Sequence, residues 1–521
     1  MNHKVLITAS GRGARLGEIT DYTNKTLVKV GKKPAISYIV ESYPKETEFI
    51  VTLGHYGDHV RDYLDIAHPK SNIKFVKVDK YEGPGSSLLY SMLKTKDYLQ
   101  SPFIYHASDT IVDSITANPN KNWVFGYKGE PTSHYASFNT LNNKVVKIHE
   151  MGEIDPEYIY VGLLALKDFK AFWHELNQYY LSEKHHERSN DTHVVNKLID
   201  LGIDFHAKEC KKWHDTGNVE SLAKARQEID DSFHILDKLE ESIFLHDKHV
   251  VKFFHDKKMV EDRVKRGKIL KGLVPKILKS KNNFYQYEHV KGDLYSDVAN
   301  PKNFVKFLVW ANDNLWKPVK EVEQKEFKKI CYDFYYTKTI ERVEKFQKTR
   351  SIKDKSDIIN DEKVPSLKEM FKMIDFDWIS NAEQSHFHGD FILDNIIKTK
   401  SGYCLLDWRQ NFGGLSKAGD MYYDLSKLNH NLTVNHGIVN DNLFTIEIGK
   451  NEIKCDILRK NNLVICQDIL SRFIIGQGYD IKKVKILTAL IWLNMSPLHH
   501  HPLDQFLYYF GKLNLYKALQ K

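Results

Sequence analysis

The sequence predicts an α/β protein, with a mainly parallel, doubly wound sheet in its N-terminal part and an α+β region after it. Three observations predict this. Through residues 1–225, short runs of β-forming residues alternate with helical stretches, the pattern of strand–helix–strand units. A glycine-rich loop follows the first strand-like run. Beyond residue 300 the chain reads as mostly helical, interrupted by one segment in which loops and short strands alternate.

The N-terminal elements follow from that alternation. Apolar, β-branched runs predict strands at "KVLITAS", "TEFIVTLG", "NIKFVKV" and "PFIYHASD". Helices are predicted between them at "PAISYIVESY", "DHVRDYLDIA" and "SSLLYSMLKTKDYL". Further along, Asn142-Asn143 separates two strand-like runs, and asparagine is favoured in tight hairpin turns. We therefore expect a sheet covered by helices on both faces, with a hairpin at Asn142-Asn143.

The second half begins after a charged join. The segment "QEIDDSFHILDKL" (residues 227–239) predicts a helix there, and we place the two domains at 1–228 and 240–521. A hairpin follows, with strands "ESIFLHD" and "KHVVKFFHD" and its turn at Asp247-Lys248. Next, "KKMVEDRVKRGKILKGL" predicts a helix and "NNFYQYEHV" a strand. From Asn462 to Leu519, apolar residues spaced i, i+3, i+4 predict packed helices.

The composition narrows the class of protein. With 521 residues, of which 42% are hydrophobic, the chain can form several domains with apolar cores. No apolar run reaches the ~18–20 residues that cross a bilayer, so we expect a cytoplasmic protein without a membrane span. The five cysteines are scattered, which disfavours a disulfide framework or a zinc site. A net charge of +8, with both signs interspersed, suits small anionic substrates, and we expect no nucleic-acid partner.

The first candidate site is the loop after the first strand, "SGRGARLGEITDYTNKTLVKVGKKP". Gly11 and Gly13 allow the backbone to approach a ligand closely, so that amide groups can point at phosphate oxygens. Arg15 and Lys25 add positive charge where a triphosphate would carry negative charge. The loop is not GxGxxG, and Asn24 precedes Lys25 where a Walker A loop has glycine. The loop therefore indicates phosphate binding of another kind.

This stretch resembles the signature loop and lysine of the nucleotidyltransferases that make sugar nucleotides. Three further segments match in the family's order: "EGPGSSLLYSM", "IYHASDTIVD" and "KKWHDTGNVESL". The resemblance covers roughly residues 1–225 and implies that family's α/β fold. It also implies a reaction in which a sugar phosphate attacks the α-phosphorus of a nucleoside triphosphate and pyrophosphate leaves. Because two anions must meet, the site needs cations around the transferring phosphorus.

The resemblance assigns roles to particular residues. Asp109 and Asp215 would ligate Mg²⁺, while Lys25 and Arg15 clamp phosphates. The resemblance also implies that the backbone at Gly11 and Gly13 contacts phosphate. Gly85 and Ser86 would contact the nucleobase, and Glu150 and Lys147 would contact the sugar. Ser10 and Ser108 stand where the family usually has glycine. Because serine is small, we expect a change of fine geometry there and retained binding.

The second candidate site is "HFHGDFILDNIIKTKSGYCLLDWRQNFGG". Asp390 could accept a proton from a hydroxyl nucleophile, and Asn395 and Asp407 could ligate Mg²⁺. The segment resembles the catalytic region of the aminoglycoside phosphotransferase and choline kinase superfamily, and "GDMYYDLSKL" matches its downstream helix. The resemblance implies a two-lobed, kinase-like α+β domain that uses ATP and Mg²⁺. It also implies an ATP-anchoring Lys252, which could pair with Glu261, and a hinge strand at "NFYQYEHVKG".

Together the two sites suggest one reaction sequence. A kinase that phosphorylates a small alcohol makes the substrate that a nucleotidyltransferase needs, and fusion raises the local concentration of the second enzyme. We therefore expect a bifunctional enzyme that uses ATP and a second NTP to make an activated building block, with a sugar as substrate and a surface polysaccharide as destination. Two alternatives remain open: an amino alcohol such as choline or ethanolamine with CTP, or a C-terminal domain that regulates without catalysing. The oligomeric state stays open.

Overall fold

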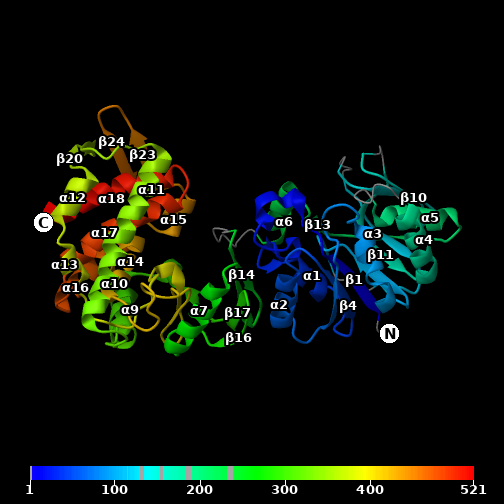
Figure 1. The fold of residues 1–521 in the computed structure, drawn as a ribbon, viewed down its shortest axis with the longest axis horizontal. Coiled ribbons are helices and arrows are strands. Elements are labelled where there is room, and N and C mark those ends of the chain that lie inside the picture. The colour runs from blue at the N-terminus through cyan, green and yellow to red at the C-terminus, as the bar shows by residue number, and fades with distance from the viewer. Residues whose placement is uncertain are drawn as a thin grey trace. The chain divides into compact units, whose positions relative to one another are not determined.

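The computed structural model describes residues 3–113, 115, 117–129, 134–152, 156–182, 189–230 and 239–520. The chain divides into two compact units (Figure 1). The first comprises Met1–Val260 and Leu278–His289, and the second comprises Glu261–Ile277 and Val290–Lys521. Most of the helix predicted over residues 227–239 lies outside the described residues, since 231–238 are not among them.

A nine-stranded sheet forms the centre of the first unit, in the order β5-β4-β1-β6-β11-β8-β12-β10-β9. Its strands are β1 (Lys4–Ala9), β4 (Glu48–Leu53), β5 (Asn72–Lys77), β6 (Phe103–His106), β8 (Trp123–Tyr127), β9 (Ser137–Leu141), β10 (Lys144–His149), β11 (Tyr158–Leu166) and β12 (His206–Cys210). The strands β5, β4, β1 and β6 are parallel. Beyond them β11 is antiparallel to both neighbours, so the sheet is mixed where a mainly parallel one was predicted. The difference arises because β11 pairs with strands far along the chain, which local alternation does not encode.

Helices cover both faces of this sheet, as predicted. They are α1 (Ala35–Glu41), α2 (Gly57–Ala67), α3 (Leu88–Leu93), α4 (Phe169–Ser182), α5 (Asp191–Asp200) and α6 (Val219–Ile229). Along β1 the side chains alternate: Val5 and Ile7 join the core under α1 and α2, whereas Leu6 joins the core under α3, α4 and α5. Both cores exclude water from a strand that is hydrophobic on both faces, as a central strand requires.

The Asn142-Asn143 hairpin is confirmed. Strands β9 and β10 pair antiparallel on either side of these two residues. Asn142 and Asn143 have φ of 53° and 62°, the left-handed conformation that a two-residue hairpin turn demands.

A second, four-stranded sheet completes the first unit. It consists of β14 (Glu241–Leu245), β15 (His249–Phe254), β17 (Phe284–Glu288) and β16 (Ile277–Lys281), in that order. The predicted hairpin with its turn at Asp247-Lys248 is confirmed, since β14 and β15 pair antiparallel around it. Phe244, Phe253 and Phe284 share one buried core with Tyr63 and Leu64 of α2. Compactness therefore groups this sheet with the N-terminal part, and the domain boundaries predicted at residues 228 and 240 stay a prediction.

Helix α7 (Lys257–Ile269) leads into the second unit, which is mainly helical as predicted. The helices of this unit are α8 (Tyr295–Val298), α9 (Pro301–Asn314), α10 (Gln324–Tyr332), α11 (Lys338–Arg350), α12 (Leu367–Met373), α13 (Phe376–Ser380), α14 (Met421–Thr433), α15 (His436–Asn440), α16 (Asn461–Gly476), α17 (Ile481–Met495) and α18 (Leu503–Gln520). A π-helical turn, Asp333–Thr337, joins α10 to α11. The short strands form two sheets: β18 (Asp293–Leu294), β21 (Ile396–Lys398) and β22 (Tyr403–Leu405) in one, and β19 (Asp357–Ile359), β20 (Glu362–Val364), β23 (Phe444–Ile448) and β24 (Ile453–Ile457) in the other.

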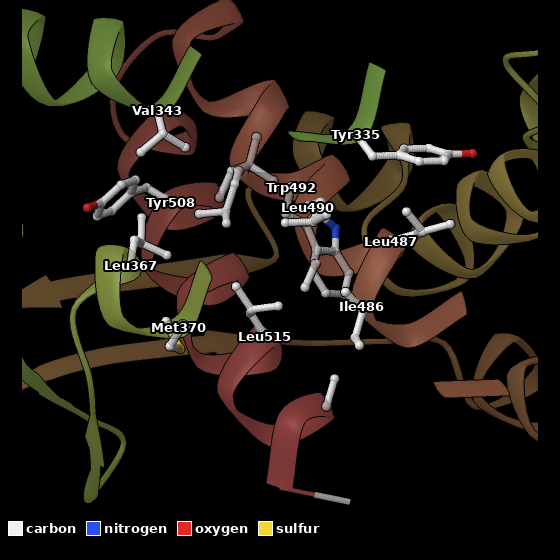
Figure 2. Close-up of a cluster of buried hydrophobic side chains, with 14 of the residues drawn as sticks. Tyr335, Val343, Leu367, Met370, Ile486, Leu487, Leu490, Trp492, Tyr508 and Leu515 are labelled. Atoms are coloured by element: carbon white, nitrogen blue, oxygen red, sulfur yellow. The ribbon is translucent and has the colours of Figure 1, made fainter. Parts of the chain in front are cut away.

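The main core of the second unit lies between α11, α12, α17 and α18. Figure 2 shows side chains from these helices pointing toward one another, among them Leu490 of α17 and Leu515 of α18. The i, i+3, i+4 spacing that predicted packed helices near the C-terminus supplies this apolar surface. In the part of the chain that the structure describes, no helix has both the length and the apolar character needed to cross a membrane.

Candidate functional site

The glycine loop leaves β1 at its carboxyl end, between the parallel neighbours β4 and β6. This is the position where open α/β sheets bind ligands. Gly13 has φ +75°, and a Cβ there would lie 2.7 Å from Cβ of Lys25, so this position requires glycine. A Cβ on Gly11 would meet nothing within 4 Å, so the backbone of Gly11 has room for a ligand.

Asn24 fixes the position of Lys25 in this loop. Its Nδ2 donates to the carbonyls of Ala9 (2.9 Å) and His55 (2.6 Å), and its Oδ1 accepts from the amide of Thr26 (2.9 Å). Asn24 is fully buried and caps the short 3-10 helix Lys25–Leu27. The sequence marked Asn24 only as an exception to Walker A, and its anchoring role emerges from the structure.

Asp109 follows β6 and faces the loop. Its Oδ2 accepts a hydrogen bond from Lys25 Nζ at 2.8 Å. Burial alone would raise the pKa of Asp109, but the charges of Lys25 and Arg15 outweigh it and hold that pKa below its ordinary value. Asp109 is therefore an ionised carboxylate that lies near two basic side chains. A carboxylate must be ionised to be a good ligand for a divalent cation.

Asp215 reaches the same place through a two-stranded ribbon, β7 (Thr110–Val112) and β13 (Trp213–Asp215). Its register partner is Thr110, which places it beside Asp109. Hydrogen bonds from Ser221 Oγ (2.8 Å), the Gly217 amide (2.9 Å) and Tyr135 Oη (3.1 Å) orient its carboxylate. The structure thus brings together the two aspartates that the sequence separated by more than a hundred residues.

Gly217 lies close to all of these groups. A Cβ on Gly217 would lie 3.1 Å from Oδ1 of Asp215, 3.2 Å from Oδ2 of Asp109 and 3.2 Å from a guanidinium nitrogen of Arg15. Two carboxylates that approach one point in this way are a suitable partial ligand set for Mg²⁺, which completes its shell with water and substrate phosphates. Bound there, Mg²⁺ would neutralise charge on the transferring phosphoryl group.

Other residues of this region form contacts of their own. Ser10 is buried, and its hydroxyl lies 2.9 Å from that of Ser91, which ties the loop to α3. Ser86 donates to the carbonyl of Gly83 (2.7 Å), and the carbonyl of Gly85 accepts from Tyr180 (3.1 Å), in the turn before α3. Their nucleobase contact stays a prediction.

Lys147 and Glu150 belong to another part of the sheet. Lys147 is exposed on β10, and Glu150 follows that strand, where it pairs with His193 at 3.1 Å. Within the described residues, no hydrogen bond or ion pair joins either side chain to Lys25, and their predicted sugar contact stays untested.

The second candidate site lies on the loop before β21. Gly389 takes φ +89°, which lets the chain turn so that Asp390 projects from it. Asn395 Nδ2 donates to Oδ2 and to the backbone oxygen of Asp390, both at 3.0 Å, which leaves its side-chain oxygen available to a ligand. Lys427 of α14 forms an ion pair with Asp390 at 2.8 Å. Burial alone would raise the pKa of Asp390, but Lys427 above all holds it far below its ordinary value, so Asp390 is ionised.

Asp424 holds this loop in place through hydrogen bonds to its backbone. Its carboxylate accepts from the amides of His388 and Gly389, both at 2.7 Å, and from Trp316 Nε1 at 3.1 Å. Asp424 is the second aspartate of "GDMYYDLSKL", so this motif positions the turn that carries Asp390. His388 is fully buried and hydrogen-bonded to the carbonyl of Leu406 at 2.8 Å, consistent with a structural role.

Asp407 lies next to Asn395 through the backbone. The Leu406 amide donates to the carbonyl of Asn395 at 2.7 Å. Asp407 takes φ +55°, a conformation that is costly for a non-glycine residue, and Arg263 lies 3.4 Å from its Oδ1. Asn395 and Asp407 could hold Mg²⁺ together with nucleotide phosphates. Among the described residues, no three His, Cys, Asp or Glu side chains gather in a way that could hold a metal ion.

Arg266 of α7 is a residue that the sequence did not single out. It is fully buried, and it donates to the carbonyls of Phe387 (2.5 Å), Ser416 (3.1 Å) and Arg409. Its guanidinium also lies 3.9 Å from the centroid of the Phe387 ring. Burial lowers the pKa of Arg266 to about 9, so the side chain stays charged near neutrality. Through these hydrogen bonds, Arg266 connects the segment before Asp390, at Phe387, with the segment after it, at Arg409 and Ser416.

The two residues predicted to anchor ATP lie on different elements, β15 and α7. Lys252 is buried on β15, where its register partners are Ile243 and Tyr285. Glu261 is exposed on α7. The strand position predicted for Lys252 is confirmed, while its role and its pairing with Glu261 stay predictions.

Comparison with known proteins bears on the N-terminal part. No protein-family model matches the chain. The choline-phosphate cytidylyltransferase of Streptococcus pneumoniae is 27% identical over 117 residues, which cover 22% of this chain and 48% of that protein. The bifunctional protein GlmU of Methanocaldococcus jannaschii is 21% identical over 249 residues, covering 46% of this chain and 58% of that protein. The chain thus spans about half the length of the curated relatives it matches.

A solved structure, the CTP:phosphocholine cytidylyltransferase from Streptococcus pneumoniae, aligns with 44% of this chain and 100% of its own, at 21% identity and a TM-score of 0.38. The similarity in sequence to the two curated relatives covers 22% and 46% of this chain, in its N-terminal part. The phosphotransferase resemblance of the second unit rests on its own residues.

Proposed function

We propose that this chain is a bifunctional enzyme. The second unit phosphorylates the hydroxyl group of a small molecule with ATP, and the first unit couples the product to a nucleoside triphosphate with release of pyrophosphate. The observation that carries the proposal is the convergence of Lys25, Arg15, Asp109 and Asp215 near Gly217, at the carboxyl end of β1. Two cations and two carboxylates so placed suit a reaction between two phosphate-bearing anions.

In the nucleotidyl transfer, a phosphate oxygen of the acceptor attacks the α-phosphorus of the NTP. A new P–O bond forms, and the bond between the α-phosphorus and the β-phosphate oxygen breaks. Lys25 and Arg15 would hold the phosphates in line, which lowers the electrostatic cost of bringing two anions together. Asp109 and Asp215 would hold the cation that the fold implies, and Tyr135 and Ser221 keep Asp215 oriented.

In the phosphorylation, the acceptor oxygen attacks the γ-phosphorus of ATP, ADP leaves, and the hydroxyl proton passes to Asp390. Because Lys427 keeps Asp390 ionised, the carboxylate is ready to accept that proton. A carboxylate with so low a pKa is a weak base, so its main contribution would be to orient the hydroxyl group. Asn395 and Asp407 would hold the cation.

The substrate proposed first is a sugar, and the product would then be an activated sugar for a surface polysaccharide. A second candidate is an amino alcohol with CTP, which is favoured by the similarity to the choline-phosphate cytidylyltransferase of Streptococcus pneumoniae. A third is a regulatory, non-catalytic C-terminal domain. It predicts that Asp390→Asn leaves product formation unchanged when the unphosphorylated compound is supplied.

A two-part assay tests the proposal. The protein is supplied with ATP and a panel of sugars and amino alcohols, and ADP formation is followed. Each NTP is then added, and pyrophosphate release is followed. The proposal expects one compound to give both products in sequence. If a phosphorylated compound is activated but no parent alcohol is phosphorylated, the kinase half of the proposal fails.

A further inference from the structure

Two basic side chains, those of Lys427 and Arg409, act on Asp390, and two further ones, those of Lys338 and Arg342, come from α11. Lys427 forms the ion pair already described. Arg409, two residues after Asp407, acts electrostatically on both Asp390 and Lys427. Lys338 and Arg342 lie one turn apart on α11, and Lys338 feels the charges of Arg409, Arg342 and Lys427. Two cations thus act on one ionised carboxylate, and two further basic groups lie within electrostatic reach of Arg409.

Aromatic rings hold two of these cations close to each other. Lys338 Nζ lies 4.3 Å from the centroid of the Phe334 ring, and Cζ of Arg409 lies 5.1 Å from the same centroid. Arg409 also donates to the hydroxyl of Tyr423 at 3.4 Å. Cation–π contacts stabilise a positive charge without cancelling it, so the site remains positive.

Carboxylates do not balance this charge. Among the residues that the structure describes, none of Lys338, Arg342 and Arg409 forms an ion pair with Asp or Glu, and only Lys427 does. Burial first, and then the neighbouring cations, lower the pKa of Lys338 to about 7. Keeping like charges together in a half-buried place is costly, so the arrangement is suited to a bound anion.

A buried polar atom in the same place also lacks a partner. His430, one turn after Lys427 on α14, is 5% exposed, and its Nδ1 makes no hydrogen bond within the described part of the chain. The charges of Lys427 and Asp390 act on His430, as do those of His436 and His499. Buried polar atoms are rarely left unsatisfied, and a polar ligand would supply the missing partner.

We propose that the hydroxyl acceptor of the second unit is an anion, a small alcohol that also carries a carboxylate or phosphate group. Lys338, Arg342 and Arg409 bind that negative group, while Asp390 receives the hydroxyl proton as the oxygen bonds to the γ-phosphorus and ADP leaves. This rests on the phosphotransferase function proposed above, and it narrows that function: an amino alcohol such as choline would bring its positive charge to a site that is already positive.

The test uses the full-length protein, ATP, Mg²⁺ and acceptors that share a carbon skeleton but differ in charge. The three-carbon set is glycerol, glycerate, glycerol 3-phosphate and serinol. The six-carbon set is glucose, gluconate, glucose 6-phosphate and glucosamine, and choline is added. We expect an anionic member to exceed its neutral analogue by at least about tenfold in kcat/KM, since a hydrogen bond to a charged group contributes enough for that factor. The carboxylate and phosphate arms show which anion is preferred.

Variants test whether Lys338, Arg342 and Arg409 cause the preference for an anionic acceptor. Lys338→Met should lower kcat/KM for the anionic acceptor about tenfold or more, leave the neutral acceptor within about threefold, and leave KM for ATP unchanged. Lys345→Met removes an exposed lysine from the same helix and serves as the control, with no change expected. If Lys338→Met raised KM for ATP and left acceptor preference intact, the cations would serve the nucleotide and the inference would be overturned.

The two levels of the proposal fail differently. If a neutral or cationic alcohol is the best acceptor and Asp390→Asn abolishes its phosphorylation, the kinase function stands and the anionic acceptor is wrong. If no compound of any charge is phosphorylated, the kinase function fails, and the inference fails with it.

Discussion

Lys25 Nζ lies 2.8 Å from Oδ2 of Asp109, and the two side chains are only 19% and 18% exposed. Without substrate the ammonium group neutralises the carboxylate, which lowers the cost of holding an ionised aspartate in a mostly buried place. A triphosphate in the glycine loop would compete for Lys25 and leave Asp109 available to a cation. The Lys25–Asp109 ion pair can therefore stabilise the ionised carboxylate before substrate binds, and it can break when Lys25 binds a phosphate group.

Lys25→Met tests this relationship. Removing the ammonium group takes away a phosphate contact and leaves Asp109 with less compensation, so we expect kcat/KM for pyrophosphate release to fall about 10²–10³-fold. Phosphorylation by the second unit should be unchanged. Lys45→Met, which removes an exposed lysine of the same unit, is the matched control. An equal loss in that control would contradict a specific role for Lys25.

Gly217→Ala tests whether the site requires glycine beside the two carboxylates. The added methyl group would lie 3.1–3.2 Å from Asp215, Asp109 and Arg15, so it should reduce nucleotidyl transfer by at least about tenfold through crowding of the bound phosphates. The melting temperature should move by only about 2 °C or less, because the added methyl group would meet the ends of three side chains, which can shift by a few tenths of an ångström. Gly476→Ala, whose Cβ would meet nothing within 4 Å, should leave nucleotidyl transfer unchanged and should not lower the melting temperature, since alanine is favoured over glycine in a helix. A large fall in stability with Gly217→Ala would show that the position is structural.

Arg266→Met tests the buried support of the Asp390 loop. The substitution leaves several carbonyl groups without donors, so we expect a loss of about 3 kcal/mol or more in the free energy of unfolding. Arg266→Lys should not rescue it, since one ammonium group cannot reproduce the geometry of a guanidinium. Urea denaturation of the full chain measures both, with exposed Lys268→Met as the control. Wild-type stability in Arg266→Lys would contradict this role.

Asp424 predicts a pH dependence of stability. Burial raises its pKa to about 6 in the folded chain, although the amides of His388 and Gly389 oppose the shift. Because the folded pKa lies above the ordinary value of an aspartate, the contribution of Asp424 is full below about pH 4 and is lost as pH rises through about 6, by about 3 kcal/mol in total. Thermal denaturation at pH 4.5 and 7 should show a larger advantage of wild type over Asp424→Asn at the lower pH. An advantage that grows with pH would contradict this sign.

Local patterns in the sequence predicted most of the helices and strands, while the chemistry of both sites stays a prediction. The Asn142-Asn143 turn, the strand of Lys252 and the helices near the C-terminus follow from short-range signals such as turn residues and apolar periodicity. Asp109 and Asp215 could be proposed as partners because two separate motifs carry them. Their meeting across the β7–β13 ribbon is visible only in three dimensions.

Long-range packing accounts for what the sequence did not predict. The antiparallel β11 and the shared core of the four-stranded sheet with α2 depend on pairings between distant segments. Arg266 reads as one more basic residue in a charged helix, yet it is buried against the Asp390 loop. Lys338 and Arg342 likewise look like ordinary surface charges of α11, and only their place beside Arg409 gives them a role.

Complementation between two inactive variants tests the central claim most directly. Asp109→Ala and Asp390→Ala proteins are each given the acceptor alcohol, ATP and the second NTP, and the nucleotide-linked product is measured. The account predicts that neither variant alone makes product, that Asp390→Ala makes it when given the phosphorylated acceptor, and that an equal mixture of both restores it from the alcohol. A mixture that stays inactive, or an Asp390→Ala protein that converts the alcohol as fast as wild type, would contradict two independent sites acting in sequence.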